Sequence, residues 1–194
     1  MSDISSLEQA DVALGVQLAS RRHDPLVHSF VKVGTLGDQG PLYAAGLGVM
    51  LVGLVGRRAR LVRAGVSVFC AVGVAHAAKT AVKKLIKRTR PHKLMEQGRY
   101  VSGAGGSEEK PEQSFPSGHM AATVAAARAL SDSFPGSTPW TTAASGVIAL
   151  ARLAKGAHWP ADIIAGILIG HVSEKVSGAA LRMLGVLPEP PRRR

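Results

Sequence analysis

The stretch AGVSVFCAVGVAHAAKTAVKKLIKRTRP, residues 64–91, decides the fold that this sequence predicts. Up to Ala78 it carries no charged residue and is rich in glycine and alanine. Its second half gathers lysines and arginines until Pro91 ends the helical pattern. A helix that spans a bilayer needs about 20 mainly apolar residues, and small residues let such helices pack closely. We interpret this stretch as a membrane-spanning helix with a basic end.

Other parts of the chain repeat this pattern. Residues 41–56 and 134–151 are also free of charge, and a further apolar run follows at 163–170. Almost no segment alternates polar and apolar residues as a strand would. The sequence therefore predicts an all-α fold, an integral membrane helical bundle with about five spanning helices, in preference to a soluble bundle.

The chain is expected to form a single domain, 1–194. Leu7, Ala10, Leu14 and Leu18 recur at helical spacing, so we expect amphipathic N-terminal helices within 1–40. The membrane bundle would occupy 41–187, and 188–194 would be a basic tail.

The charge balance points to an anionic partner. The chain has 24 Lys and Arg against 13 Asp and Glu, a formal net charge of +11, which favours nucleic acid, a membrane surface or a phosphorylated substrate. Aromatic residues make up only 4% of the chain, so the basic residues lack stacking partners for nucleic acid. We therefore expect membrane lipids and a lipid phosphate as partners, and no nucleic acid.

The first candidate site cluster is KKLIKRTRP, residues 83–91. Lys83 and Arg90 are seven residues apart, which would place them on one helix face two turns apart. Such a pair can hold an anion with several oxygens, because arginine offers a planar fork and lysine a point charge. The alternative is a basic run that contacts lipid headgroups. Lys84, Lys87 and Arg88 would bind a second phosphate or form a solvated face.

The second cluster is PSGH, residues 116–119, directly before an alanine-rich run. A helix N-terminus presents unpaired N–H groups and a positive dipole end, which together favour phosphate. Ser117 would cap the helix or contact the anion, Gly118 would allow close approach, and His119 would bring a titratable proton. The alternative is an ordinary N-cap followed by a structural histidine.

The third cluster is ARLAKGAHWPAD, residues 151–162. If His158 opens the last helix, Asp162 faces it one turn along and can accept one ring N–H, which fixes the tautomer. The other ring nitrogen is then free to act as a nucleophile. An interfacial His/Trp belt would explain Trp159 but not the spaced Asp162.

Together, K-x-x-x-x-x-x-R-P, P-S-G-H and R-x-x-x-x-x-H-x-x-x-D resemble the three-part signature of the type 2 phosphatidic acid phosphatase superfamily. The resemblance covers Lys83 to Asp162. It implies that His158 attacks phosphorus, that Asp162 orients His158, and that His119 exchanges the proton. The phosphate-binding residues would be Lys83, Arg90, Ser117, Gly118 and Arg152, with no metal and no cofactor.

One position departs from the family pattern. The family usually has a serine before the arginine of the third motif, and here that residue is Ala151. The missing hydroxyl removes one phosphate hydrogen bond, whose net contribution is about 1 kcal/mol. We therefore expect altered binding and retained chemistry.

The resemblance implies a membrane lipid phosphate phosphatase. An undecaprenyl-type diphosphate is the first substrate expected. Phosphatidylglycerophosphate, phosphatidate and a polyprenyl-phosphoryl sugar phosphate are alternatives, and a vanadium haloperoxidase or a non-catalytic lipid-binding member are more distant ones. The three clusters and the 98–114 loop would share one membrane face. Because the opposite face collects Arg57, Arg58, Arg60 and Arg63, the positive-inside rule would place the site on the extracytoplasmic face of a bacterial inner membrane.

Overall fold

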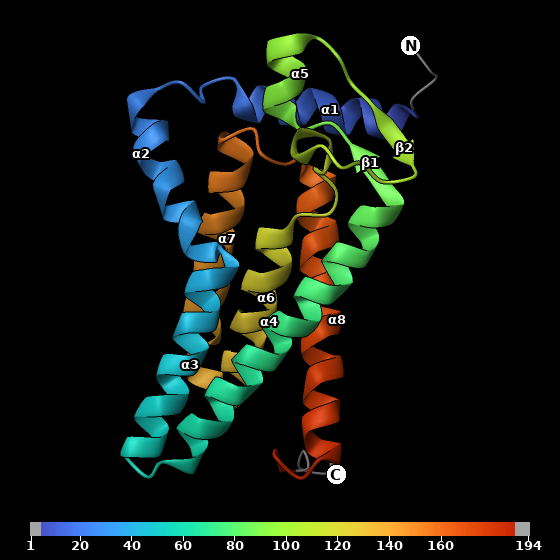
Figure 1. The fold of residues 1–194 in the computed structure, drawn as a ribbon. Coiled ribbons are helices and arrows are strands. Elements are labelled where there is room, and N and C mark those ends of the chain that lie inside the picture. Colours follow the sequence, from blue (N-terminus) through green and yellow to red (C-terminus); the bar gives the residue numbers. More distant parts are fainter. Residues whose placement is uncertain (1–4, 189–194) are drawn as a thin grey trace.

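The computed structural model describes residues 5–188, and within them the all-α prediction is confirmed (Figure 1). Eight α-helices are joined by short turns and 3-10 helices, and one small sheet interrupts them. The helices are α1 (Ser6–Ala19), α2 (Pro25–Val33), α3 (Gln39–Val55), α4 (Ala59–Leu85), α5 (Pro91–Gln97), α6 (Gly118–Ser133), α7 (Thr138–Ala154) and α8 (Pro160–Met183). The strands are β1 (Ile86–Arg88) and β2 (Ser102–Ala104), and the 3-10 helices are η1 (Gly34–Gly37), η2 (Lys110–Glu112) and η3 (Pro135–Ser137).

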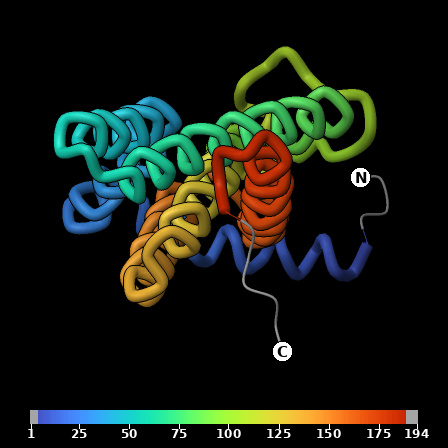
Figure 2. Tube along the Cα trace, turned by 90° about the horizontal axis from the view of Figure 1, so that it is seen from below, coloured from blue at the N-terminus to red at the C-terminus, as the bar shows by residue number. Residues whose placement is uncertain are grey.

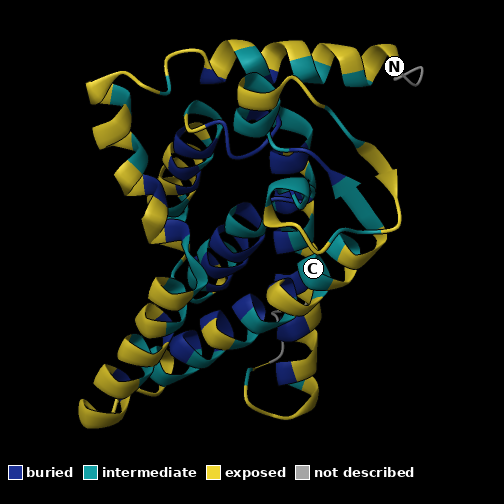
Figure 3. Ribbon diagram, turned by 45° about the horizontal axis from the view of Figure 1, so that its top comes forward, coloured by how far each residue is buried: buried dark blue, intermediate teal, exposed yellow. Residues whose placement is uncertain are grey.

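Helix α6 forms the centre of the bundle, and α4, α7 and α8 pack around it. Its face is built from alanines such as Ala121 and Ala125, which are fully buried together with Ala71 and Ala75 of α4. In Figure 3, α6 is mostly buried while α3, which packs on α4, is largely exposed. Because alanine side chains are small, the helix backbones come close together and the core is thin.

Two glycines of α8 permit its approach to α6. A Cβ atom on Gly166 would lie 2.6 Å from the backbone oxygen of Ser117, and one on Gly170 would lie 2.7 Å from that of Ala121. Real Cβ atoms essentially never approach backbone oxygens so closely. The glycines therefore set the distance between the helix that begins at the PSGH cluster and the helix that follows His158.

Two of the described helices, α4 and α8, are long and apolar enough to cross a membrane. The pair formed by Pro25–Gly37 and Gln39–Val55, bent by 52°, makes a third if it counts as one span. Helices α6 and α7 have only 16 and 17 residues. The fold thus has membrane-spanning helices as expected, and the number of about five stays a prediction.

The first helix lies across the ends of the bundle helices instead of running along them (Figures 1 and 2). It forms where the sequence predicted an amphipathic helix, but its leucines do not enter the core. Leu7, Leu14 and Leu18 are exposed, whereas Gly15 and Ala19 are the buried residues of α1. An apolar face that points away from the protein at the end of a bundle suits the membrane interface.

The predicted helix from Ala64 to Arg90 ends early, so Lys83 and Arg90 do not share a helix face. Helix α4 stops at Leu85, and Ile86–Arg88 pairs antiparallel with Ser102–Ala104. The backbone groups of this segment find their partners in the 98–114 loop, which a single-segment pattern does not reveal. Pro91 then begins α5, where the missing N–H of proline costs nothing. Except for Pro188, the predicted basic tail lies outside the described residues.

Gly166→Ala is expected to destabilise the protein, because its Cβ would press against the Ser117 backbone and, at 2.9 Å, the Met120 side chain. Overpacking of this kind costs about 1–3 kcal/mol. The matched control is Gly146→Ala in α7, where a Cβ would meet nothing within 4 Å and alanine is the better helix former. Thermal unfolding in detergent should show a lower Tm for Gly166→Ala alone, and equal Tm values for the two variants would contradict this account of the α6–α8 contact.

Candidate active site

The three sequence clusters meet at the end of the bundle that carries α1 and α5 (Figure 1). A pocket of about 480 Å³ opens there. Its walls come from η1, α4, α5, η2, α6 and the turns beside them, so residues from all three motifs share one cavity. The lining residues that were predicted as site residues are Lys83, Arg90, Gly118, His119 and His158.

The two histidines face one another across the pocket. The ring centroids of His119 and His158 are 6.3 Å apart, and the rings meet edge to face. His158 is 2% exposed and lies in the turn between α7 and α8, while His119 lies in the first turn of α6. Proline at 160 starts α8 immediately after His158, so the histidine is held at the mouth of that helix.

The orientation of His158 is set by a backbone oxygen. Its Nδ1 lies 2.9 Å from the carbonyl oxygen of Ser114 and 3.6 Å from Oδ2 of Asp162. Because a carbonyl only accepts, Nδ1 must carry the hydrogen, and in the neutral ring Nε2 keeps a free lone pair. The predicted tautomer results, with the Ser114 carbonyl as the nearer acceptor and the carboxylate of Asp162 beside it.

The charge state of His158 also suits a nucleophile. Burial lowers the pKa of His158, and the positive charges of Arg90 and Lys83 act in the same direction, while contact with Asp162 opposes them. The net pKa lies below its ordinary value, so the imidazole is neutral at physiological pH.

Asp162 is completely buried and accepts hydrogen bonds from several directions. Oδ2 receives the Ser114 hydroxyl at 2.5 Å and the Trp159 backbone N–H at 2.9 Å, and Oδ1 receives Nη1 of Arg88 at 2.9 Å. Trp159 is buried, with its indole N–H donating to the Thr89 carbonyl at 2.6 Å, so the belt interpretation of Trp159 is wrong. Asp162 thereby ties α8 to β1 and to the end of the 98–114 loop.

Arg88 belongs to this buried network, and the expectation that it forms part of a solvated or headgroup-binding face is wrong. Its Nη2 contacts Oδ2 of Asp11 at 2.6 Å, and its Nε donates to the Tyr100 hydroxyl at 3.0 Å. Burial alone would lower the pKa of Arg88, but Asp162 and the other partners hold it above its usual value. Asp11 also accepts the Ala161 N–H at 2.8 Å, which fixes α1 to the start of α8.

The predicted phosphate ligands divide into two groups. Lys83, Arg90 and Gly118 line the pocket, and the Nζ of Lys83 also donates to the Gln113 carbonyl. The Nε of Arg90 is buried and has no hydrogen-bond partner within residues 5–188. Ser117 instead acts as the N-cap of α6, because its hydroxyl accepts from Met120 N at 3.4 Å and its own N–H donates to the Asp162 carbonyl at 3.0 Å.

Arg152 lies behind the pocket wall. It donates to the Gly34 carbonyl, and its Nη2 lies 3.7 Å from Oδ1 of Asp38. The neighbouring Ala151 is fully buried, and a Cβ on Gly34 would come within 3.0 Å of its side chain. Residue 151 therefore packs against the chain between α2 and α3.

Asp38 and Lys79 are among the pocket residues that sequence reasoning missed. Asp38 contacts Nε2 of His119, and the sequence offered it only as one polar residue in a glycine-rich loop. Lys79 lies one turn before Lys83 on the same face of α4, and its Nζ would be 3.8 Å from a Cβ on Gly118. The i, i+4 spacing of Lys79 and Lys83 was a readable signal for this second cation.

We expect Arg88→Met to destabilise the protein by about 3–5 kcal/mol, because it leaves the Asp162 carboxylate buried without its cation. The control is Arg99→Met, which removes an equal charge from an exposed position and should stay within about 0.5 kcal/mol of the parent. Equilibrium unfolding in detergent measures both. If Arg88→Met were as stable as Arg99→Met, the ion pair would not hold the site together.

Known proteins are similar to this chain in sequence or in fold. Two sequences named decaprenylphosphoryl-5-phosphoribose phosphatase, from two Mycobacterium tuberculosis strains, are each 28% identical over 130 residues. The alignment covers 64% of this chain and 66% of theirs, slightly less than two thirds of their length. The crystal structure of Aquifex aeolicus LpxE matches with a TM-score of 0.61 and 20% identity, covering 92% of this chain and 98% of that one, which shows a shared fold. The family model described as the PAP2 superfamily matches residues 62–179, more than half of the chain and all three motifs, and this protein belongs to that superfamily.

Proposed function

We propose that this protein is a membrane phosphatase that hydrolyses a lipid phosphate through a phospho-histidine. The observation that carries the proposal is the placement of His158 and His119 on facing sides of a pocket lined by Lys83 and Arg90. An acid and a nucleophile on either side of an anion-binding space is the arrangement that in-line phosphoryl transfer requires.

In the first step, Nε2 of His158 attacks phosphorus and forms a P–N bond while the bond from phosphorus to the leaving oxygen breaks. His119 gives its proton to that leaving oxygen. In the second step a water attacks the phospho-histidine, His119 removes a proton from the water, and the P–N bond breaks with its electron pair returning to His158. Burial and the charge of Arg152 lower the pKa of His119 to about 4, and Asp38, which contacts its Nε2, opposes them in favour of the protonated ring. The negative charge of a phosphate in the pocket would act in the same direction as Asp38.

The cations stabilise the charge on the phosphoryl oxygens during both steps. Lys83 and Arg90 reach the pocket from different elements, and the N-terminus of α6 at Gly118 adds backbone N–H groups and a positive dipole end. Losing one such preorganised donor typically costs about 2.7–4 kcal/mol of transition-state stabilisation. Arg152 supports the site from behind by holding Asp38.

Two observations support a substrate with two phosphate groups. Lys79 and Lys110 line the same pocket beyond the residues of the three motifs, so it holds more positive charge than one phosphate needs. The similar Mycobacterium tuberculosis sequences are named for a decaprenylphosphoryl sugar phosphate. A polyprenyl-phosphoryl sugar phosphate thus becomes the first candidate, ahead of the undecaprenyl-type diphosphate favoured by the sequence alone.

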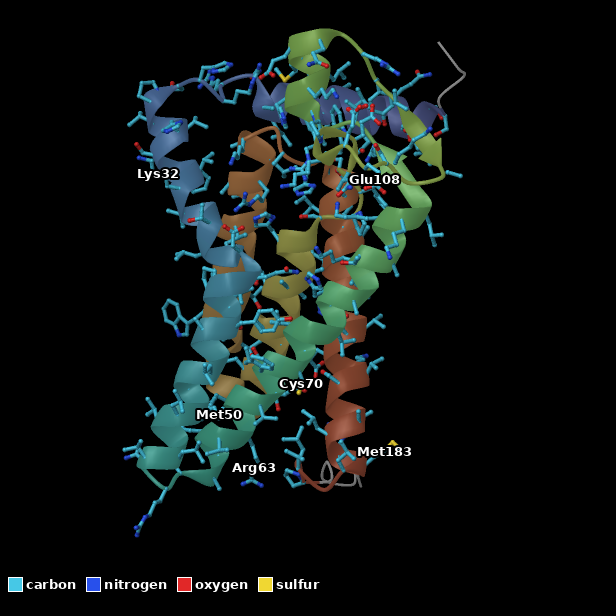
Figure 4. All side chains as sticks on the ribbon, viewed as in Figure 1. Lys32, Met50, Arg63, Cys70, Glu108 and Met183 are labelled. Atoms are coloured by element: carbon cyan, nitrogen blue, oxygen red, sulfur yellow. The ribbon has the colours of Figure 1, made fainter. Side chains whose placement is uncertain are left out.

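The same arrangement supports a proposal for the membrane face that carries the site. Arg57, Arg58, Arg60 and Arg63 lie at the end of the bundle opposite the catalytic pocket (Figure 4, where Arg63 is labelled). The positive-inside rule supports the proposal that this end is cytoplasmic and that the pocket opens on the extracytoplasmic face of a bacterial inner membrane. Protease accessibility of the 98–114 loop in oriented vesicles would show which face carries the pocket.

His158→Gln is expected to reduce phosphate release at least about a thousandfold, and His119→Gln by about 10²–10⁴-fold. His28→Gln, which alters an exposed histidine on α2, is the matched control and should keep full activity. Acid-labile, alkali-stable phosphate bound to protein after a rapid quench should appear in the parent and be lost in His158→Gln. Full turnover by folded His158→Gln would exclude the proposed nucleophile.

Lys79→Met should lower kcat/KM by about 10- to 100-fold for substrates with two phosphate groups, since a charge-assisted hydrogen bond contributes about 1.5–3 kcal/mol. Its effect on phosphatidate should be smaller. Lys84→Met, an exposed lysine on the same helix that does not line the pocket, serves as control. Phosphate release from detergent-solubilised polyprenyl-phosphoryl sugar phosphate, polyprenyl diphosphate, phosphatidylglycerophosphate and phosphatidate measures both effects. Equal losses on all four lipids would argue against a second phosphate subsite.

A further inference from the structure

A second and larger pocket lies at the opposite end of the bundle from the catalytic histidines. Its volume is about 850 Å³, and its walls come from α4, α6, α8 and the turn that carries η3. Arg63 and Lys83 mark the two ends on α4, and their separation of 20 positions corresponds to roughly 30 Å of helix. This pocket, which we name the basal pocket, is therefore separate from the catalytic one.

Arginines dominate the lining of the basal pocket. Three helices contribute them: Arg60 and Arg63 from α4, Arg128 from α6, and Arg182 from the last turn of α8. Figure 4 labels Arg63 and Met183, which mark this end of α4 and α8. Four guanidinium groups that converge from separate helices form a concentrated positive site.

Two carboxylates also line this pocket and balance part of that charge. Asp132 lies 3.6 Å from Nη2 of Arg128, one helical turn away on α6. Glu174 is buried on α8, near Arg182 across Gly178. With four arginines against two acids, the basal pocket keeps an excess of two positive charges when both acids are ionised.

The arginines play different parts. Arg60 donates twice to the Ser133 carbonyl, at 2.9 and 2.7 Å, and its Cζ lies 4.7 Å from the centroid of the Phe134 ring. Arg60 is therefore already engaged by the protein and stabilises the wall of the pocket. Within residues 5–188, the only hydrogen bond that Arg63 makes is to its own helix, from Nε to the Ala59 carbonyl at 3.3 Å. Its terminal guanidinium nitrogens are thus free to serve a ligand.

Buried donors in the wall also lack partners. Ser67 is 6% exposed, and its hydroxyl has no hydrogen-bond partner within residues 5–188. The Nε of Arg128 is likewise buried and unpartnered in that range. Buried polar groups are nearly always hydrogen-bonded in native proteins, so these two donors indicate that a ligand with acceptor oxygens belongs here.

We propose that the basal pocket binds a phosphate group, with Arg63, Arg128, Arg182 and Ser67 as its donors. Guanidinium forks match phosphate oxygens in shape and charge, and a hydroxyl adds a neutral donor. The cavity is larger than one phosphate and has room for the headgroup that bears it. The phosphate comes either from an anionic phospholipid at that membrane surface or from a dissolved phosphorylated molecule.

The experiment measures the thermal stabilisation of the full-length protein in detergent as ligand is added. Phosphatidylglycerol and inorganic pyrophosphate are the two anionic probes. Phosphatidylcholine, a lipid without net charge, is the control ligand. Every variant carries Lys83→Gln and Arg90→Gln, which weaken anion binding in the catalytic pocket. In this background Arg63→Gln/Arg182→Gln should raise the half-saturating concentration at least about tenfold.

The matched control is Arg57→Gln/Arg58→Gln, which removes the same charge from the same end of the molecule at positions that do not line the pocket. This control should bind as the background protein does. Stabilisation by phosphatidylglycerol alone identifies a lipid headgroup, and stabilisation by pyrophosphate as well identifies a free phosphate site. The proposal is overturned if the control loses as much affinity as the pocket variant, or if phosphatidylcholine stabilises equally.

Ser67→Ala provides a second variant should the double arginine variant fail to fold. It removes a hydroxyl that has no partner in the described structure, so it should leave the Tm without ligand unchanged or higher. A weaker response to both anionic probes supports the site. If both anionic probes stabilise Ser67→Ala as much as the background protein, Ser67 is not a ligand and the proposal that the basal pocket binds phosphate is refuted.

Discussion

The buried carboxylate of Asp162 is the group on which the arrangement of the candidate active site depends. It receives Arg88 from β1, the Ser114 hydroxyl from the end of the 98–114 loop, and the Trp159 N–H from the start of its own helix. A charge removed from water needs a cation and several donors around it, and here each donor comes from a different segment. Satisfying one carboxylate therefore fixes the positions of three segments that surround His158.

The thin core of small residues complements this polar network. Alanines on α4 and α6, and Gly166 and Gly170 on α8, let three backbones approach until the first turn of α6 lies beside the turn of His158. The close packing limits the distance between the helices, and the Asp162 carboxylate ties α8 to β1 and to the end of the 98–114 loop. The two histidines consequently face each other across a pocket whose cations come from α4, the residue before α5, and η2.

The first helix is a peripheral segment that is tied to the candidate active site. Asp11 contacts both Arg88 and the Ala161 N–H, and Tyr100 donates to Glu8 at 2.6 Å, so α1 is tied to the residues around Asp162. Its exposed leucines point away from the protein. A helix held at one face by the Asp11–Arg88 ion pair and apolar at the other suits the boundary between the candidate active site and the lipid surface.

The sequence by itself determined the helical class, the order of the segments and the three motif clusters, because apolar runs with charged ends and short fixed spacings are local properties of the chain. It could not determine that Arg88 turns inward, that Asp38 holds His119 or that Ser114 orients His158. Those contacts join residues 74, 81 and 44 positions apart. The sequence pattern also predicted that the helix would continue through Arg90. In the structure, residues 86–88 instead form backbone hydrogen bonds with the 98–114 loop as a strand. Only the tertiary structure decides such pairings, because a buried charge or backbone group selects its partner from whatever the packed helices bring within reach.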